Sequence, residues 1–340
     1  MSRFMRNLRF LCQMLNMRFR THRPIFLSHM ITSRCDCKCV FCHYWRLGKK
    51  VEMNTDQVQK MLKDAWDSGF TDYVVWGGEP LLRGDLPKIL SYANRIGLDN
   101  TVITNGNALK GMIGEIGGDL YGLIVSLDHP NPASHDGLRG CNGIFRRAVQ
   151  GIEGAKEFDH VNIFINCVIH KGNMGYLKGM AQLAESLGVK ITYEMMEVVK
   201  GYNEHLALTP REVREAAYEL LRLKEEGYPV ANSSSYFKAL AQHAEYRCHV
   251  PKVLLTVEWD GNVRVCSTIA EECKPNIRDY SLGNVTQRSF KEIFASEKYL
   301  EYVQEAERCW KCDLSYPREI ALAYSFNGEV LRNFFGRIVK

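Results

Sequence analysis

Three cysteines follow one another at short intervals near the start of the chain, in the pattern Cys35-x3-Cys39-x2-Cys42. Three thiolates on one tight loop can ligate three irons of a [4Fe–4S] cube. Because such a cube normally takes four protein ligands, this spacing leaves one iron open to a substrate or cofactor. A zinc module commonly has a second ligand pair shortly downstream, whereas the next cysteine after this loop is Cys141. The pattern therefore favours a cluster with an open iron.

A second group of thiols lies near the C-terminus, at Cys248, Cys266, Cys309 and Cys312. The first two stand at the outer ends of an expected hairpin whose turn contains Gly261, and the last two form a Cys-x2-Cys pair. Four thiolates complete a cube with no open iron, which suits electron transfer or structure. A four-cysteine hairpin site equally describes a zinc ribbon, so iron and zinc both stay open for this group.

The other cysteines are expected to bind no metal. Cys37 lies inside the first group, but alternation along an extended loop predicts that its side chain points away from Cys35 and Cys39. Cys273 is a surplus thiol of unknown use, and the isolated cysteines are interpreted as small buried hydrophobes: Cys12, Cys141 and Cys167. Twelve cysteines in 340 residues without a recognisable signal peptide predict a reducing, cytoplasmic location rather than a disulfide framework.

Alternating strands and helices must position the first group. Apolar runs predict six strands separated by helices, at residues 25–32, 73–76, 101–104, 120–127, 161–169 and 190–196. This order is typical of an α/β protein whose parallel sheet closes into a partial, TIM-like (β/α)6 barrel. Cys35 follows the first strand, and the carboxyl ends of the strands are where such a barrel builds its active site.

The chain changes pattern after the sixth strand. We expect three successive parts: the barrel at 24–205, a helical bridge at 206–240 and a small α+β domain at 241–325. That domain would consist of a β-hairpin on an Asp260-Gly261 turn and a helix at 290–307. Basic amphipathic segments at 1–23 and 326–340 flank these parts. No window approaches the roughly 20 apolar residues that a membrane-spanning helix needs.

The first cysteine group, with Phe41 directly before its last cysteine, resembles the signature of the radical S-adenosylmethionine (radical SAM) superfamily. The second expected strand runs into Gly77-Gly78-Glu79-Pro80, which is similar to the segment with which that family binds the amino group of the SAM methionine. Glycines permit a close backbone approach, and the carboxylate would pair with the ammonium. The resemblance spans about residues 25–312.

The resemblance implies further contacts with SAM. Phe41 would lie against the adenine, Ser126 would contact the ribose or the methionyl part, and Arg139 would meet the SAM carboxylate. Asn166 on the fifth expected strand is a weaker match.

The second cysteine group is similar to the twitch or SPASM extension of radical SAM enzymes. Since Asp313 follows Cys312 and no later cysteine exists, the chain looks like the shorter twitch form with one auxiliary [4Fe–4S] cluster. This resemblance favours iron over zinc for the second group. Two [4Fe–4S] clusters and SAM are therefore the cofactors that it implies.

A radical SAM oxidoreductase is the function that the resemblance implies. Reductive cleavage of SAM would give a 5′-deoxyadenosyl radical that abstracts a hydrogen atom from the substrate, and the auxiliary cluster would transfer an electron. A flavodoxin- or ferredoxin-like protein is the expected donor. The alternative from another class is a zinc-stabilised membrane- or RNA-binding protein without catalysis, which leaves residues 77–80 unexplained.

Charge and amphipathic pattern bear on the partners. Residues 1–34 contain seven Arg and no Asp or Glu; removing them from the formal net charge of +5 leaves −2, so nucleic acid is not an expected partner. Residues 3–20 form an amphipathic pattern that is typical of contact with a membrane surface, and 326–340 is similar. Both suggest a lipid-like or hydrophobic substrate, with a peptide or small molecule as the alternative. Packing of both segments on the barrel is equally consistent with the pattern.

Overall fold

The computed structural model describes residues 3–21, 23–264, 266, 281–306, 308, 309, 312–325 and 327–329. Its centre is one nine-stranded sheet in the order β6-β5-β4-β3-β2-β1-β7-β8-β9. The first six strands are parallel and neighbour one another in chain order: β1 (Phe26–Thr32), β2 (Asp72–Gly77), β3 (Asp99–Thr104), β4 (Leu120–Ser126), β5 (Asn162–Ile169) and β6 (Lys190–Met195). The predicted α/β partial barrel is confirmed.

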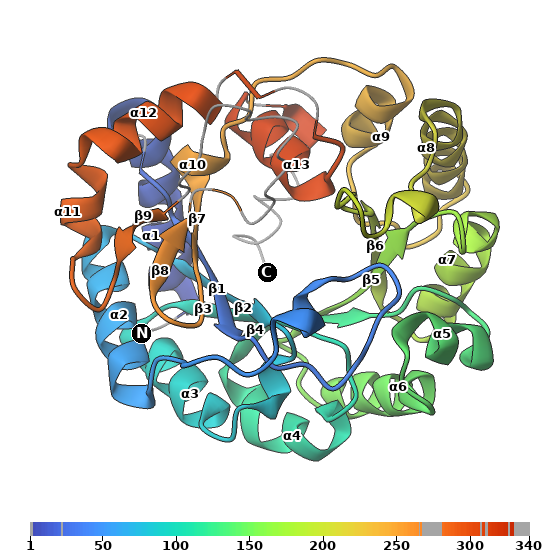
Figure 1. The fold of residues 1–340 in the computed structure, drawn as a ribbon, viewed down its shortest axis with the longest axis horizontal. Coiled ribbons are helices and arrows are strands. Elements are labelled where there is room, and N and C mark those ends of the chain that lie inside the picture. Colours follow the sequence, from blue (N-terminus) through green and yellow to red (C-terminus); the bar gives the residue numbers. More distant parts are fainter. Residues whose placement is uncertain are drawn as a thin grey trace.

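Helices alternate with these strands and surround them on the outside (Figure 1). They are α2 (Thr55–Ser68), α3 (Leu86–Ile96), α4 (Leu109–Ile116), α5 (Pro132–Arg139), α6 (Ile144–Ala155), α7 (Leu177–Ser186) and α8 (Pro210–Glu225). Their amphipathic sequences turn apolar residues towards the sheet, and Val58, Leu62 and Ala65 of α2 are fully buried. The resulting core holds the carboxyl ends of the strands in place beneath the cysteine loop.

The predicted hairpin is present as β7 (Leu254–Val257) and β8 (Asn262–Arg264), and β9 (Ser281–Asn284) adds a further antiparallel strand. Gly261 lies in its turn with a φ of 88°, in the left-handed region that favours glycine. β7 pairs in parallel with β1, so the hairpin continues the barrel sheet. The domain limits given above stay predictions.

The prediction of one helix at 290–307 is wrong, because two helices occupy this region, α11 (Phe290–Phe294) and α12 (Glu297–Ala306). Ser296 separates them: Tyr299 N donates to its Oγ (3.3 Å), as at a helix N-terminus. The remaining helices of this part are α9 (Ser234–Ala241), α10 (Val250–Val253) and α13 (Ser315–Tyr324). Cys273 and most of the predicted tail at 326–340 lie outside the described residues.

The N-terminal segment is helical as predicted, with α1 (Arg3–Asn16) continuing as a π-helical stretch (Met17–Thr21). Arg6 donates to Leu98 O (3.1 Å) and Asp99 Oδ1 (3.2 Å), at the amino end of β3. Arg9 donates to Trp66 O (2.6 Å) and stacks on the Trp66 ring. α1 therefore packs on the barrel at the end opposite to the cysteine loop.

Helix α13 lies along the side of the barrel that no described strand closes, between α9 and α10 (Figure 1). At its N-terminus, the carboxylate of Glu194 on β6 accepts hydrogen bonds from Ser315 N and Oγ. At its other end, Tyr324 packs with Phe10 and Ile25 beside the start of β1. The helix thus joins the carboxyl end of β6 to the amino end of β1.

Replacing Glu194 with Gln should change how stability depends on pH. Burial raises the pKa of Glu194 from 4.5 to about 7, although Ser315 donates to it. The folded protein then keeps a proton that the unfolded chain releases, so the free energy of unfolding falls as pH rises from 4.5 to 7 and the full penalty is present above pH 7. Gln keeps both contacts with Ser315 without a charge.

We therefore expect Glu194→Gln to raise the midpoint of thermal unfolding by roughly 2–4 °C at pH 8, with a smaller gain at pH 5. Anaerobic calorimetry of the cluster-loaded protein at both pH values measures the difference. A gain that is larger at pH 5 than at pH 8 would contradict the assignment.

Candidate active site

The loop that carries the first cysteines is held from two sides at the carboxyl end of β1. Its backbone pairs with the end of α5, where Lys38 N donates to Arg139 O (3.1 Å). Two residues that follow β6 bind its carbonyls: Asn203 Nδ2 donates to Phe41 O, and Tyr202 OH donates to Cys42 O, both at 2.8 Å. These contacts fix the path of the loop and hence the directions of its thiols.

The thiols of Cys35, Cys39 and Cys42 pack with Phe41 and Met196 in one cluster of mostly buried side chains. Burial raises the pKa of Cys39 to about 12 and also raises that of Cys42. A hydrogen bond from Cys37 lowers the pKa of Cys35 to about 7. Buried thiolates need a positively charged partner, such as the iron of a cluster, to stabilise their charge. This set of thiol donors therefore fits an iron–sulfur cluster.

Cys37 lies elsewhere than predicted. Its side chain is fully buried and hydrogen-bonds with Cys35 instead of pointing away from it. The loop is not extended here, because Asn105 reaches over from the end of β3 and donates to Asp36 Oδ1 (2.8 Å) and to the Cys37 sulfur (3.2 Å). The expected orientation is therefore wrong, while the expectation that Cys37 is no ligand stays a prediction.

The glycine pair after β2 docks directly on the cysteine loop. Gly78 N donates to Thr32 O (2.8 Å), and Glu79 N donates to Arg34 O (2.7 Å). A Cβ built on Gly78 would stand 2.0 Å from Arg34 O, which is closer than any side chain can come. The two glycines thus allow one backbone to approach the other, and the cysteine loop is the surface approached.

The carboxylate of Glu79 is completely buried beneath this contact. Its oxygens accept from Thr104 Oγ1 (2.7 Å), Asn105 N (2.7 Å) and Leu81 N (3.0 Å). Burial raises the pKa of Glu79 to about 8, against these three donors. The Glu79 carboxylate is thus hydrogen-bonded by groups of the protein itself, at the start of the short turn Pro80–Leu82.

Phe41 lies between two nitrogen-bearing side chains. Its ring centroid is 5.2 Å from that of His170 and 5.3 Å from the guanidinium carbon of Arg139. Arg139 is buried, forms an ion pair with Asp128 (2.6 Å) and contacts the Cys39 sulfur (3.8 Å). In the described part of the chain, Arg139 Nε and His170 Nε2 are buried without a hydrogen-bond partner. Such atoms mark a place where a polar ligand can bind beside Phe41.

Ser126, the last residue of β4, and Asn166, in the middle of β5, are register partners. The Oδ1 atom of Asn166 accepts from Thr192 Oγ1 of β6 (2.9 Å), so a polar row crosses three neighbouring strands. The structure brings these two predicted residues together. None of the described contacts joins them to Phe41 or Arg139.

The second cysteine group gathers around aromatic side chains next to α13. Cys248 and Cys309 are buried in one cluster with Tyr246 and Tyr316 at its edge. Burial raises the pKa of Cys312, and the neighbouring thiols of Cys266 and Cys248 raise it further. The four predicted thiols therefore lie near one another, and Arg318 of α13 fixes the last of them by donating to Cys312 O (2.9 Å).

Among the described residues, no three His, Cys, Asp or Glu side chains stand close enough to hold one metal ion.

Tyr44 connects the surroundings of the two thiol groups, and sequence reasoning missed it. Burial raises the pKa of Tyr44, and Glu197, Cys42 and Cys266 act in the same direction. Its ring packs edge-on against Trp76 (5.5 Å between centroids). Its position two residues after Cys42 is the one signal in the sequence; His170, Tyr202 and Asn203 offered none.

A parallel partial barrel with a three-thiol loop at its carboxyl end and a second four-thiol group defines an iron–sulfur enzyme. The chain belongs to the radical SAM superfamily, whose characteristic domain is matched by residues 30–184. Residues 248–313 match the SPASM iron–sulfur cluster-binding domain. The predicted family, enzyme class and cofactors, [4Fe–4S] clusters and SAM, are thereby confirmed. The match of an iron–sulfur domain to the second thiol group also decides against its interpretation as a zinc ribbon.

Similar proteins match over most of their length. Fe-coproporphyrin III synthase of Methanosarcina barkeri is 27% identical, over 85% of this chain and 80% of its own. PqqA peptide cyclase of Rhizobium meliloti is 26% identical, over 78% of this chain and 74% of its own.

Solved structures share the fold. SuiB of Streptococcus suis bound to S-adenosylmethionine has a TM-score of 0.70 at 15% identity, covering 88% of this chain and 72% of that one. The structure of anSMEcpe with bound AdoMet has a TM-score of 0.67 at 17% identity, covering 93% of this chain and 98% of that one.

Proposed function

We propose that this protein is a radical SAM oxidoreductase whose SAM-binding [4Fe–4S] cluster is held by Cys35, Cys39 and Cys42. The observation that carries the proposal is the packing of these thiols with Phe41 at the carboxyl end of the barrel. When bound, the cluster supplies the electron that cleaves SAM into methionine and a 5′-deoxyadenosyl radical, which takes a hydrogen atom from the substrate.

The side chains around the loop would bind SAM. Phe41 offers an apolar ring to the adenine, and the unpartnered nitrogens of His170 and Arg139 beside it can bond to polar groups of the cofactor. Ser126 and Asn166 add a hydroxyl and an amide on the neighbouring strands. Glu79 acts as a positioning residue in this proposal, because its carboxylate fixes the turn to Thr104 and Asn105 at the end of β3 while its backbone N–H binds Arg34 O of the cysteine loop.

Cys248, Cys266, Cys309 and Cys312 would hold one auxiliary [4Fe–4S] cluster. Cys42 and Cys266 both raise the pKa of Tyr44, so the Tyr44 side chain stands near one thiol of each group. Held by four thiolates with no open iron, such a cluster would supply one-electron transfer rather than substrate ligation, and we propose a net oxidation or a bond-forming step. A flavodoxin- or ferredoxin-like protein would reduce the first cluster.

The proposed substrate is a hydrophobic molecule with polar groups. Half-buried and buried side chains alternate along β4, β5 and β6. The buried ones pack against the outer helices, so the half-buried ones face the barrel interior. They combine apolar and polar groups: Ile124, Ser126, Phe164, Asn166, Thr192 and Glu194. The names of the relatives, a porphyrin synthase and a peptide cyclase, make a peptide or another small molecule the alternative.

SAM cleavage by the anaerobically reconstituted, dithionite-reduced protein tests the proposal. We expect 5′-deoxyadenosine and methionine in equal amounts by chromatography, and faster formation when a hydrophobic, lipid-like molecule rather than a peptide is added. Iron-loaded protein that makes no 5′-deoxyadenosine with either addition would overturn the proposed function. Faster formation with peptide alone would overturn the proposed substrate class and leave the reaction standing.

A further inference from the structure

The outward face of α1 is apolar along its whole length. Among the described residues, five of the large hydrophobic side chains that are most exposed lie on residues 3–21: Phe4, Met5, Leu8, Leu15 and Phe19. Phe4 is 73% exposed, and Leu8 and Leu15 are 44% and 49% exposed. At about 100° per residue, positions 4, 8 and 15 fall within roughly 40° of one another, so they form one stripe.

This stripe is held in place by the opposite side of the same helix. Phe10 is buried against Ile25 and Val253, Arg6 is bound to Asp99 at the start of β3, and Arg9 is bound to Trp66 at the end of α2. Arg18 donates to Tyr324 O of α13 (3.1 Å). Since the buried side is anchored by these contacts, the helix cannot rotate its apolar stripe inward.

The charges around the stripe select the surface that it fits. Arg3 and Arg20 are exposed at its two ends, and Arg23 is exposed just beyond it. No Asp or Glu occurs before Asp36. An apolar stripe flanked by arginines, with no acidic residue, matches the interface of an anionic bilayer, where apolar side chains enter the acyl boundary and arginines meet phosphates.

We propose that α1 docks this protein peripherally on an anionic phospholipid membrane. In the described part of the chain, no helix is both long and apolar enough to cross a bilayer, so the contact would be interfacial. The proposal stands on the exposed face of α1 and is independent of the reaction at the cysteines.

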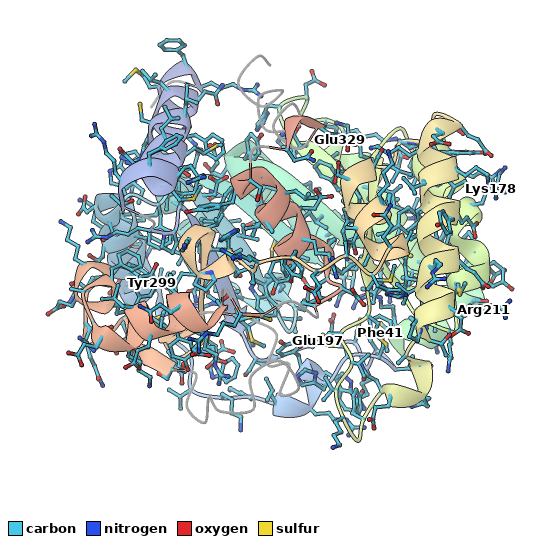
Figure 2. All side chains as sticks on the ribbon, turned by 90° about the horizontal axis from the view of Figure 1, so that it is seen from above. Phe41, Lys178, Glu197, Arg211, Tyr299 and Glu329 are labelled. Atoms are coloured by element: carbon cyan, nitrogen blue, oxygen red, sulfur yellow. The ribbon has the colours of Figure 1, made fainter. Side chains whose placement is uncertain are left out.

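The position of α1 gives this docking a direction. α1 binds Asp99 at the start of β3 and Phe70 just before β2, whereas the cysteine loop follows the carboxyl end of β1. Figure 2 shows the blue-violet helix α1 at the upper left of the molecule and Phe41 and Glu197 in its lower half. A docked molecule would therefore turn its cysteine sites away from the lipid, and the substrate would enter from the opposite end.

Flotation of the cluster-loaded, full-length protein with phosphatidylcholine vesicles, with and without one quarter phosphatidylglycerol, tests the docking. We expect the protein to float with the anionic vesicles, and Phe4→Gln/Leu15→Gln to lower the floated fraction by about ten-fold. Gln keeps a high helix propensity, so α1 persists. The matched control is Tyr218→Gln/Leu300→Gln, whose side chains are 58% and 53% exposed on α8 and α12; it should float like the wild type.

Wild-type protein that stays unfloated with anionic vesicles would overturn the proposal, as would equal losses in the two double variants. If light scattering instead finds a dimer that Phe4→Gln/Leu15→Gln converts to a monomer, the stripe is an interface between two copies and the membrane proposal is wrong. Formation of 5′-deoxyadenosine by the same samples separates these outcomes from a failure of the proposed reaction.

Discussion

Replacing Cys35, Cys39 and Cys42 together with Ala should abolish the conversion of SAM to 5′-deoxyadenosine, a loss of about 100-fold or more. The three thiols pack together with Phe41, and the proposed second site lies in a separate side-chain cluster. Iron analysis should therefore find about half of the wild-type iron, held by the second group. The two readouts together distinguish loss of one centre from loss of the fold.

Two single variants serve as controls for this result. Cys12→Ala removes an exposed thiol on α1, at the other end of the barrel, and should change neither iron content nor product formation. Cys37→Ala tests the thiol that lies unexpectedly against Cys35; we expect it to keep the full iron content. Product formation by the triple variant would show that the radical chemistry does not depend on the first loop.

The strand order of the barrel was predictable from the sequence because buried parallel strands form short apolar runs between amphipathic helices. The hairpin was predictable from its Asp-Gly turn. Its attachment was not, because nothing local in residues 254–257 shows that they pair with β1. The break of the expected helix 290–307 at Ser296 was not predictable either, because it depends on local capping by Ser296, whereas the apolar spacing continues across the break.

Within the site, the sequence indicated which residues carry chemistry better than it indicated how they are held. Thiol spacing marked Cys35, Cys39 and Cys42, but the orientation of Cys37 depends on Asn105, which is 68 positions away in the chain. Asn203 and Tyr202 bind the loop from beyond β6, and such contacts leave no periodic signal. Which side chain reaches a given backbone carbonyl is set by the fold, so such a contact can be identified only from the structure.

Gly78→Ala should disrupt the first site by a steric route that needs no change in any thiol. The new Cβ would stand 2.0 Å from Arg34 O and 2.4 Å from Arg34 C, which are backbone atoms without a rotamer to relieve the clash. The turn and the cysteine loop must separate, which breaks the bonds from Gly78 N to Thr32 O and from Glu79 N to Arg34 O. We expect about a ten-fold or greater loss of 5′-deoxyadenosine formation and incomplete iron loading of the first site.

The matched control is Gly84→Ala, six residues further along, where a Cβ meets nothing within 4 Å. It adds the same methyl group to the same connection and should leave iron content and product formation unchanged. Thermal unfolding of both variants separates a local effect on the first site from a global loss of stability. The second thiol group lies outside the contact between the glycine turn and the cysteine loop, so it should keep its iron. If Gly78→Ala keeps wild-type iron and activity, the turn does not need its close approach to the cysteine loop, and Glu79 cannot be positioning that loop through it.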